Sequence, residues 1–326
     1  MTGIIKTGEK RLVIVSGRAH PRLADDIAAE IGTRVLETEC RTFANGEIYA
    51  RFGESIRGAD VFIVQSHSDP INEWIMEQLI MVDAAKRASA KRITVVAPCF
   101  PYSRQDKKGR GREPISARLM ADMYKAAGAD RIMSVDLHAS QIQGFFDGPV
   151  DHLFAMPVLL EHFRERLDRD TLTVVSPDMG RVRVADRWSD QLDAPLAIIH
   201  KRRDPKVANK VTVHEIVGEV AGRVCLLVDD LIDTGGTIVQ AAEALKANGA
   251  TSVIVGATHA VFSPPAVERL SSSAAVDTVV VTDTLPLPED KRFDKLTVLP
   301  IAPLIARAIQ EVFGDGSVTS MFDGAA

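Results

Sequence analysis

The sequence predicts an α/β protein built on parallel sheets. Short runs of apolar and β-branched residues recur along the chain, and most are continuous rather than alternating, as expected of strands buried on both faces. Segments with helical spacing separate these runs. Strands that alternate with helices are typical of βαβ units. The predicted strands are 12–15, 61–65, 93–97, 132–135, 172–175, 196–199, 224–228, 253–255 and 279–281.

Two of the predicted helices show the pattern most clearly. Residues 72–88 and 239–247 each place apolar side chains on one helix face. Each helix runs into a similar turn and strand, so that 83–90 and 243–250 resemble each other. An ancient duplication explains this resemblance, and so does the general helix–turn–strand pattern; both explanations stay open. The sequence therefore predicts two similar halves.

The length also favours two domains. A chain of 326 residues exceeds the ~150 residues of one typical domain. Turn residues cluster at 148–157 and predict the boundary there. We expect an N-terminal domain at 10–155, a C-terminal domain at 156–313 and a tail at 314–326. The tail is too polar for another helix, and we expect it to return to the N-terminal domain or to a regulatory site.

Composition excludes several classes of protein. Lys and Arg number 39 against 44 Asp and Glu, and the net charge of −5 argues against nucleic-acid or membrane-surface partners. The three cysteines, Cys40, Cys99 and Cys225, lie too far apart for a disulfide framework or a Cys-x-x-Cys pair. We expect no secretory signal and no transmembrane segment, because no apolar run approaches ~20 residues. These features predict a cytoplasmic protein.

The most informative segment is 224–239. It predicts a buried strand, two carboxylates at the carboxyl end, a glycine-containing loop and then a helix. Open α/β sheets bind ligands at this end of their strands. Backbone N–H groups at the start of the helix can hold a phosphate, and the hydroxyls of Thr234 and Thr237 add donors. Asp229 and Asp230 repel phosphate but accept hydrogen bonds from sugar hydroxyls, directly or through a metal. The segment therefore predicts a site for ribose 5-phosphate.

This segment resembles the phosphoribosyl-binding loop of the type I phosphoribosyltransferase fold, although a strand followed by a capped turn is the plainer alternative. The fingerprints of P-loop and Rossmann nucleotide sites are missing. Four further motifs precede it in order, at 41–47, 101–108, 135–146 and 175–178. Together, the motifs closely resemble the class I ribose-phosphate pyrophosphokinases, or PRPP synthetases, over nearly the whole chain.

The resemblance implies two similar doubly wound parallel-sheet domains of the type I phosphoribosyltransferase fold. It also implies a Mg²⁺-dependent enzyme that transfers diphosphate from ATP to the 1-hydroxyl of ribose 5-phosphate. The products are AMP and 5-phosphoribosyl 1-diphosphate (PRPP), which feeds nucleotide, histidine, tryptophan and NAD biosynthesis. A homohexamer that phosphate activates and ADP inhibits is implied as well.

The nucleotide needs an aromatic surface and polar groups at its edge. Phe43 can stack on adenine, while Asn45 and Glu47 can contact its polar edge. The alternative is a plain Asn-Gly turn between two strands, with Phe43 packed. Arg104 and Gln105 follow the predicted strand 93–97, where a guanidinium can hold triphosphate oxygens. We expect these residues to bind ATP.

The resemblance implies roles for residues that follow three other strands. His138 and Asp178 are implied as ligands of the Mg²⁺ bound to ATP, with Asp178 the better match to a hard cation. Lys201 and Arg203 are implied as catalytic residues on a flap that stabilises charge on the transferred group. The implied ribose 5-phosphate site comprises Arg203, Asp229, Asp230, Asp233, Thr234, Gly235, Gly236 and Thr237.

The family also has an anion-binding regulatory site. The implied residues are Ser55, Arg57, Lys108, Arg112, Ser140, Gln143, Ser317 and Thr319. One departure from the family is visible: a Gly-Gly pair commonly follows the metal-binding aspartate, whereas Arg181 stands at the second position here. A residue other than glycine restricts the loop backbone and changes the geometry behind the metal.

Three other functions compete with this interpretation. A phosphoribosyltransferase that consumes PRPP shares the phosphate loop but does not need Phe43, Arg104 or His138. A catalytically silent regulatory subunit is expected to lose flap or metal residues, which are all present here. A nucleotide-sensing RNA-binding regulator requires a basic face, and the net charge of −5 does not favour it.

Overall fold

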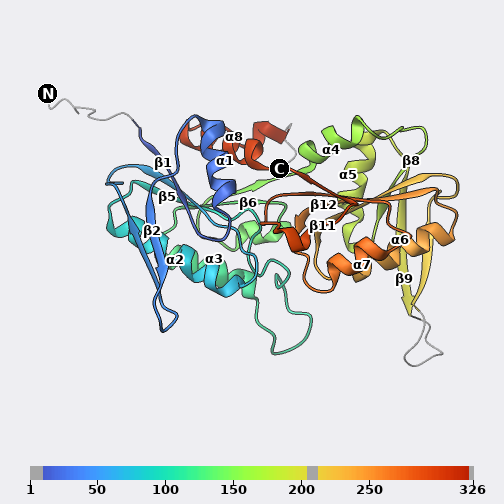
Figure 1. The fold of residues 1–326 in the computed structure, drawn as a ribbon, viewed down its shortest axis with the longest axis horizontal. Helices are drawn as coiled ribbons and strands as arrows, with labels where there is room; N and C mark the ends of the chain where they lie inside the picture. Colours follow the sequence, from blue (N-terminus) through green and yellow to red (C-terminus); the bar gives the residue numbers. More distant parts are fainter. Residues whose placement is uncertain (1–9, 204–211, 323–326) are drawn as a thin grey trace. The chain divides into compact units, whose positions relative to one another are not determined.

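The computed structural model describes the backbone of residues 10–203 and 212–322, and the side chains of 10–200 and 215–322. The chain divides into two compact units. Unit 1 comprises Met1–Leu153 together with Ala302–Ala326, and unit 2 comprises Phe154–Ile301. Each unit is built on its own sheet with helices on both faces (Figure 1).

Unit 1 contains a five-stranded parallel sheet in the order β1-β4-β5-β6-β7. In Figure 1, α1 and α8 lie against one face and α2 and α3 against the other. Ile14 of β1 pairs with Phe62 of β4 on one side and forms a parallel bridge to Val35 on the other. The segment at Val35, which follows α1, therefore lies along the side of β1 that faces away from β4. The elements are β1 (Leu12–Ser16), α1 (Pro21–Ile31), the hairpin β2 (Thr38–Thr42) and β3 (Ile48–Phe52), β4 (Asp60–Val64), α2 (Ile71–Arg87), β5 (Arg92–Val96), α3 (Ser116–Ala127), β6 (Arg131–Val135), η1 (Ser140–Gly144), β7 (Val150–Leu153), α8 (Ala302–Phe313) and η4 (Thr319–Phe322).

Unit 2 repeats this plan in a seven-stranded sheet, ordered β10-β9-β8-β11-β12-β13-β14. Only the edge strand β10 is antiparallel to its neighbour in this described sheet. Helices α4 and α5 lie on one face, and α6 and α7 on the other (Figure 1). The elements are α4 (Met156–Arg164), β8 (Leu172–Ser176), η2 (Met179–Arg181), α5 (Val182–Leu192), β9 (Leu196–Arg203), β10 (Thr212–Val217), β11 (Val224–Ile232), α6 (Gly236–Ala247), β12 (Ser252–Ala260), α7 (Ala266–Ser272), β13 (Thr278–Thr282), η3 (Glu289–Lys291) and β14 (Leu296–Leu299).

The strand predictions are confirmed, since every predicted run coincides with a strand, and only Gln65 and Ala97 fall one residue beyond β4 and β5. Their β-branched side chains are buried between the two helix layers. In unit 1, Val15 and Ile63 pack with Tyr124 of α3, and in unit 2, Val175 and Leu227 pack with Leu245 of α6. Such burial on both faces is why the apolar runs are continuous. The predicted fold class, α/β with two similar doubly wound sheets, is therefore the observed one.

The units exchange their last helices. Helix α4 follows the last strand of unit 1 but packs in unit 2, where Phe163 meets the ring of Trp188 at 6.0 Å between centroids. Helix α8 follows the last strand of unit 2 but packs against α1 in unit 1. The observed division at Leu153 thus lies near the predicted one, but 302–313 belong to unit 1 and not to a C-terminal domain. The apolar face of an amphipathic helix predicts that the helix packs against another surface, but the sequence does not say which surface that is.

The segment after α8 also belongs to unit 1. Lys10 Nζ donates to the carbonyl oxygen of Phe313 at 3.0 Å, and Asp315 forms ion pairs with Lys10 and Arg92. Within the described ranges, no helix has the length and apolar character that crossing a membrane requires.

Candidate active site

The phosphate loop of unit 2 has the predicted form. Strand β11 ends at Ile232, and α6 begins at Gly236 after Gly235, whose φ of 71° lies in the left-handed region. Glycine adopts this conformation without strain. In the described structure, no side chain caps this end of α6. The first N–H groups of a helix lack intrahelical partners, so the start of α6 is suited to an anion.

Arg269 of α7 supports this loop from behind. Its Nη1 donates to the carbonyl oxygen of Thr234 at 3.0 Å, and a Cβ added to Gly236 would lie 3.2 Å from the same nitrogen. A side chain at position 236 would therefore require the guanidinium to shift by a few tenths of an ångström. The exposed charge of Arg269 also favours an anion at the start of α6. Sequence reasoning missed this residue, because nothing in a helix 35 positions further along indicates a contact with the loop.

Asp229 and Asp230 lie in the last residues of β11, next to this loop. Arg181 contacts both carboxylates: Nε lies 3.4 Å from Asp229 Oδ1, and Nη2 lies 2.5 Å from Asp230 Oδ1. Burial raises the pKa of Asp229 well above its usual value, and the negative charge of Asp230 raises it further, while Arg181 lowers it. Asp229 and Asp230 are thus two largely buried carboxyl groups that share one arginine as their partner.

Asp178 follows β8, the strand directly beside β11. Its Oδ1 accepts from the backbone N–H groups of Gly180 at 2.8 Å and Arg181 at 3.1 Å, so it caps η2. The backbone of Arg181 is thus held by Asp178, and its side chain reaches Asp229 and Asp230. Asp178, Arg181 and the Asp229–Asp230 pair lie where the strand order of the sheet reverses. The next strand in the chain, β9, lies on one side of β8, and β11 lies on its other side.

The predicted catalytic residues lie on the adjoining strand. Lys201 and Arg203 belong to the backbone of β9, where they pair with His214 and Thr212 of β10. Their side chains, and residues 204–211, lie outside the described part of the chain.

The predicted adenine-binding residues lie at the tip of the β2–β3 hairpin. Phe43 is exposed, and the Arg41 guanidinium lies 4.6 Å from its ring centroid. The turn is closed by Phe43 N–H donating to the Glu47 carbonyl oxygen at 2.7 Å and Glu47 N–H donating to Asn45 Oδ1 at 3.2 Å. The backbone thus forms an Asn-Gly turn between two strands, and the Phe43 ring is 40% exposed while it meets the Tyr49 ring edge-on at 6.1 Å between centroids.

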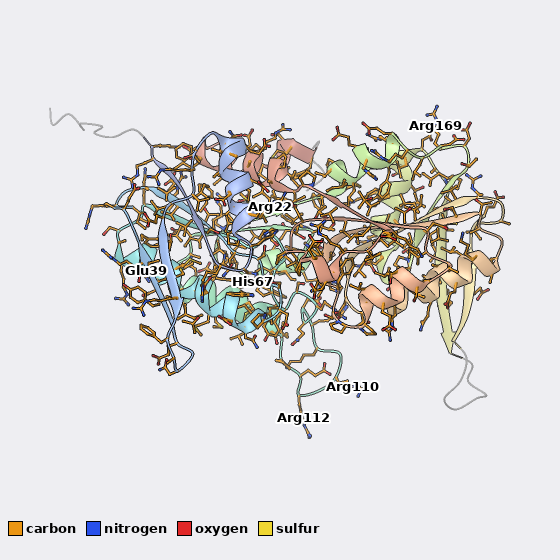
Figure 2. All side chains as sticks on the ribbon, in the orientation of Figure 1. Arg22, Glu39, His67, Arg110, Arg112 and Arg169 are labelled. Atoms are coloured by element: carbon orange, nitrogen blue, oxygen red, sulfur yellow. The ribbon has the colours of Figure 1, made fainter. Side chains whose placement is uncertain are left out.

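Arg104 and Gln105 lie in the long loop between β5 and α3. Gln105 is tied to α3, since Ser116 Oγ donates to its Oε1 at 2.6 Å and Ala117 N–H donates to its carbonyl oxygen at 3.2 Å. Arg104 is exposed in the same loop. Figure 2 shows Arg110 and Arg112 further along, with side chains directed away from the unit.

His138 lies after β6 in unit 1, half-buried, whereas Asp178 lies in unit 2. The structure therefore does not bring the two predicted Mg²⁺ ligands together within one unit. Among the residues that the structure describes, no group of three or more His, Cys, Asp or Glu side chains could hold a metal ion.

All the predicted regulatory residues lie in unit 1. Ser55 and Arg57 follow β3, and Lys108 and Arg112 lie exposed in the loop before α3. Ser140 and Gln143 belong to η1, where Gln143 Nε2 donates to the Ser140 carbonyl oxygen at 3.2 Å. Ser317 and Thr319 lie beyond α8, and the hydroxyl of Ser320 donates to the Ser317 carbonyl oxygen at 2.6 Å.

A buried polar network occupies the matching edge of the sheet in unit 1. Glu77 of α2 is fully buried and accepts from Arg18 N–H at 2.7 Å and from Gln65 Nε2 at 2.9 Å. His67, labelled in Figure 2, lies with its Nδ1 3.3 Å from the Cys99 carbonyl oxygen and its Nε2 3.2 Å from the Tyr124 hydroxyl. Burial lowers the pKa of His67 to about 4. Sequence reasoning did not single out these residues.

Two family models match this chain, and both describe ribose-phosphate pyrophosphokinases or their associated domains. Residues 12–128 match the N-terminal domain of ribose phosphate pyrophosphokinase, and residues 201–323 match a phosphoribosyl synthetase-associated domain. The ribose-phosphate pyrophosphokinase of Streptomyces avermitilis is 66% identical over 323 residues, covering 99% of each chain. That of Mycobacterium tuberculosis is 58% identical over 316 residues, covering 97% of each.

The crystal structure of phosphoribosylpyrophosphate synthetase from Mycobacterium smegmatis is similar as well. It is 56% identical, with a TM-score of 0.89, and the match covers 94% of this chain and 100% of that one. The resemblance predicted from the motifs is confirmed, and the chain belongs to the ribose-phosphate pyrophosphokinase family.

Proposed function

We propose that this member of the family transfers the β,γ-diphosphate of ATP to the 1-hydroxyl of ribose 5-phosphate. The ribose oxygen forms a bond to Pβ, the bond from Pβ to the oxygen shared with Pα breaks, and the hydroxyl proton passes to water. The products are PRPP and AMP. One observation carries the proposal: Asp178, Asp229 and Asp230 are linked through Arg181 beside an uncapped helix start.

The start of α6 supports binding of the 5-phosphate. Its N–H groups and the exposed hydroxyls of Thr234 and Thr237 are donors, and Arg269 adds positive charge behind the loop. Asp229 and Asp230 cannot bind phosphate, but they accept hydrogen bonds from the sugar hydroxyls. Donors on the loop and acceptors on the strand thus match the two ends of ribose 5-phosphate.

The hairpin tip of unit 1 supports binding of adenine. Phe43 is an exposed aromatic ring with a guanidinium 4.6 Å from its centroid, and Asn45 and Glu47 follow in the same turn. An aromatic face between a base and a cation gains from stacking and cation–π attraction. We assign triphosphate contacts to Arg104, whose guanidinium can bind two oxygens at once, with Gln105 beside it.

The donor set suits Mg²⁺. That ion prefers oxygen ligands and is commonly bound by one or two carboxylates with substrate phosphates. Asp178 is exposed after β8, and only its Oδ1 takes part in the capping bonds to Gly180 and Arg181. We therefore assign the ion to Asp178, with His138 as the weaker predicted ligand. When bound, Mg²⁺ would neutralise charge on the nucleotide phosphates.

Lys201 and Arg203 are the proposed catalytic residues. Diphosphoryl transfer depends on positioning and on stabilising negative charge, which cationic side chains supply. Their strand, β9, is parallel to β8, so the backbone of Lys201 and Arg203 lies toward the same end of the sheet as Asp178, which follows β8. This placement of the backbone supports the assignment.

Assembly and regulation are further parts of the proposal. We infer a homohexamer in the cytoplasm that phosphate activates and ADP inhibits. The three cysteines are free, as a reducing compartment requires. All eight predicted regulatory residues belong to one compact unit, which supports a shared anion site in unit 1.

Product analysis tests the proposal. Purified protein is incubated with ATP, ribose 5-phosphate, Mg²⁺ and phosphate, and the products are identified by chromatography and phosphorus NMR. We expect AMP and PRPP in equal amounts. ADP as the product would contradict diphosphoryl transfer, and PRPP consumption with a base would indicate a phosphoribosyltransferase. An absence of reaction with both Mg²⁺ and Mn²⁺ would favour the silent regulatory subunit.

A further inference from the structure

The side chain of Arg181 lies against the proposed sugar-binding carboxylates of Asp229 and Asp230. It is only 14% exposed, and its Nε and Nη2 reach Oδ1 of Asp229 and of Asp230. Its backbone N–H is held by Asp178 Oδ1 at 3.1 Å. One residue therefore joins the carboxylates after β8 to those of β11.

The charges explain why this contact matters. Asp229 and Asp230 are adjacent in sequence, and their side chains are 18% and 8% exposed. Two enclosed carboxylates repel each other unless a cation lies between them. A guanidinium is charged at every physiological pH, binds carboxylates in fixed directions and brings no coordination demand of its own. A glycine at this position supplies no such cation, so a divalent ion would have to do so.

Binding of a sugar does not require Arg181 to leave. The Arg181 guanidinium contacts Oδ1 of each carboxylate, and Asp229 Oδ1 also accepts from Asp230 N–H at 2.9 Å. Because each carboxylate oxygen can accept two hydrogen bonds, sugar hydroxyls can be accepted while the guanidinium stays in place. The orientation of both carboxylates is then set before the substrate arrives, which lowers the cost of binding.

We propose that Arg181 is a positioning residue that orients and neutralises the Asp229–Asp230 pair, so that ribose 5-phosphate binds without a divalent cation at these carboxylates. The inference rests on the proposed function, because it concerns the same sugar site. It predicts that binding of ribose 5-phosphate depends less on Mg²⁺ here than in a variant with glycine at this position.

Calorimetric titration of the full chain with ribose 5-phosphate, without nucleotide, tests this role. The unchanged protein, Arg181→Gly, Arg181→Lys and the control Arg183→Ala are each titrated in EDTA and in Mg²⁺. Arg183 is an exposed residue of α5 two positions further on. In EDTA we expect Arg181→Gly to bind ~10-fold more weakly and Arg181→Lys to fall between it and the unchanged protein. Mg²⁺ should restore most of the loss, and Arg183→Ala should stay within ~2-fold.

The other outcomes separate the possible errors. Equal weakening of Arg181→Gly in EDTA and in Mg²⁺ would mean a structural role only, and tighter binding would mean that Arg181 blocks the site; either result overturns the proposal. Unchanged affinity of Arg181→Gly would overturn it as well, but would leave the proposed function intact. Failure of the unchanged protein to bind ribose 5-phosphate in both buffers would overturn the proposal on Arg181, while the product analysis with ATP tests the proposed function separately. If thermal unfolding shows that Arg181→Gly does not fold, Arg181→Gln provides the same comparison.

Discussion

The junctions β4–α2 and β11–α6 occupy the same position in the two sheets, yet only one of them is suited to an anion. Helix α6 begins after Gly235, without a side-chain cap and without an acidic residue in its first turn. Helix α2 begins after Pro70, which has no N–H, and carries Glu73 in its first turn. The topology repeats, but the chemistry at the helix start does not.

The loops after the first strand of each sheet differ in a related way. Arg18 follows β1 and forms an ion pair with Glu77, a carboxylate fully buried inside unit 1. Arg181 follows β8 and pairs with Asp229 and Asp230, beside the start of α6. In unit 1, the buried carboxylate of Glu77 accepts hydrogen bonds from Arg18 and Gln65, so these donors are used inside the unit. In unit 2, the corresponding edge of the sheet is where we propose that the sugar phosphate binds.

The hairpins that follow the first crossover helix can be compared as well. The tip of β2–β3 carries Phe43, while β9, which pairs with β10, carries Lys201. We expect Lys201→Ala to lower kcat by ~10² or more and to leave ATP affinity nearly unchanged, because the contact is assigned to the transition state. Phe43→Ala should do the reverse, raising the Kd for ATP with a smaller effect on kcat. Single-turnover rates and nucleotide titrations measure both, and normal turnover of Lys201→Ala would remove it from the mechanism.

The Arg18–Glu77 pair should affect stability rather than chemistry. Glu77→Ala leaves Arg18, Gln65 and a buried space without their partner, and we expect the free energy of unfolding to fall by about 3 kcal/mol. Urea denaturation followed by circular dichroism measures the change. A loss below about 1 kcal/mol would show that the hydrogen bonds of Glu77 contribute little to the stability of unit 1.

The buried His67 makes stability depend on pH. Its pKa in the folded protein is about 4, below the ~6.5 of an unfolded chain, so only the unfolded state takes up a proton as the pH falls through 6.5. From pH 7 to pH 5, this group should reduce the free energy of unfolding by about 2 kcal/mol. The difference between the unchanged protein and His67→Gln, measured at both pH values, isolates the effect. An equal slope in the two proteins would contradict burial of a neutral imidazole.

Asp233 and Asp69 form a matched pair from the two junctions. Asp233 lies in the loop before α6, and Asp69 lies exposed in the loop before α2. We expect Asp233→Ala to weaken ribose 5-phosphate binding ~10-fold, because the proposed sugar-phosphate site loses a hydrogen-bonding group. Asp69→Ala should leave it within ~2-fold. Equal effects in calorimetry would mean that the two junctions are not functionally different.

Arg269 should give the smallest effect. Arg269→Gln keeps a donor for the Thr234 carbonyl oxygen but removes the charge behind the phosphate loop. Because the side chain is exposed, solvent screens that charge, and we expect KM for ribose 5-phosphate to rise ~3-fold with little change in kcat. The rise should shrink at high salt. A rise that does not depend on salt would indicate a steric role in shaping the loop.

The sequence predicted those features that depend on residues close together in the chain. Continuous apolar runs predicted the buried strands, and 224–239 predicted a strand, loop and helix that the structure contains. Strands β7, β10 and β14 were not predicted, and the hairpin β2–β3 was only the alternative to an adenine site. Strands β7, β14, β2 and β3 are only partly buried, so they lack the continuous apolar runs of the central strands. The motifs also identified the family, because their order and spacing are specific to it.

Contacts between distant residues could not be predicted in this way. Arg181 stood out in the sequence only as a departure from glycine, and its contacts with Asp229 and Asp230 depend on β8 and β11 being neighbours. Glu77 and Arg269 gave no sequence signal, because each is an ordinary charged residue in an amphipathic helix. The positions of all three follow from the order of strands in the sheet and not from local spacing.

The exchanged helices have a consequence for synthesis on the ribosome. Residues 10–153 emerge first, but α8, whose Ile305 and Ile309 are fully buried, is made only after all of unit 2. The side of α1 that packs against α8 therefore stays uncovered until translation has reached residues 302–313. A nascent chain released early would expose that apolar surface, so translation errors near the 3′ end should direct the product toward chaperones and proteases rather than leave a working half-enzyme.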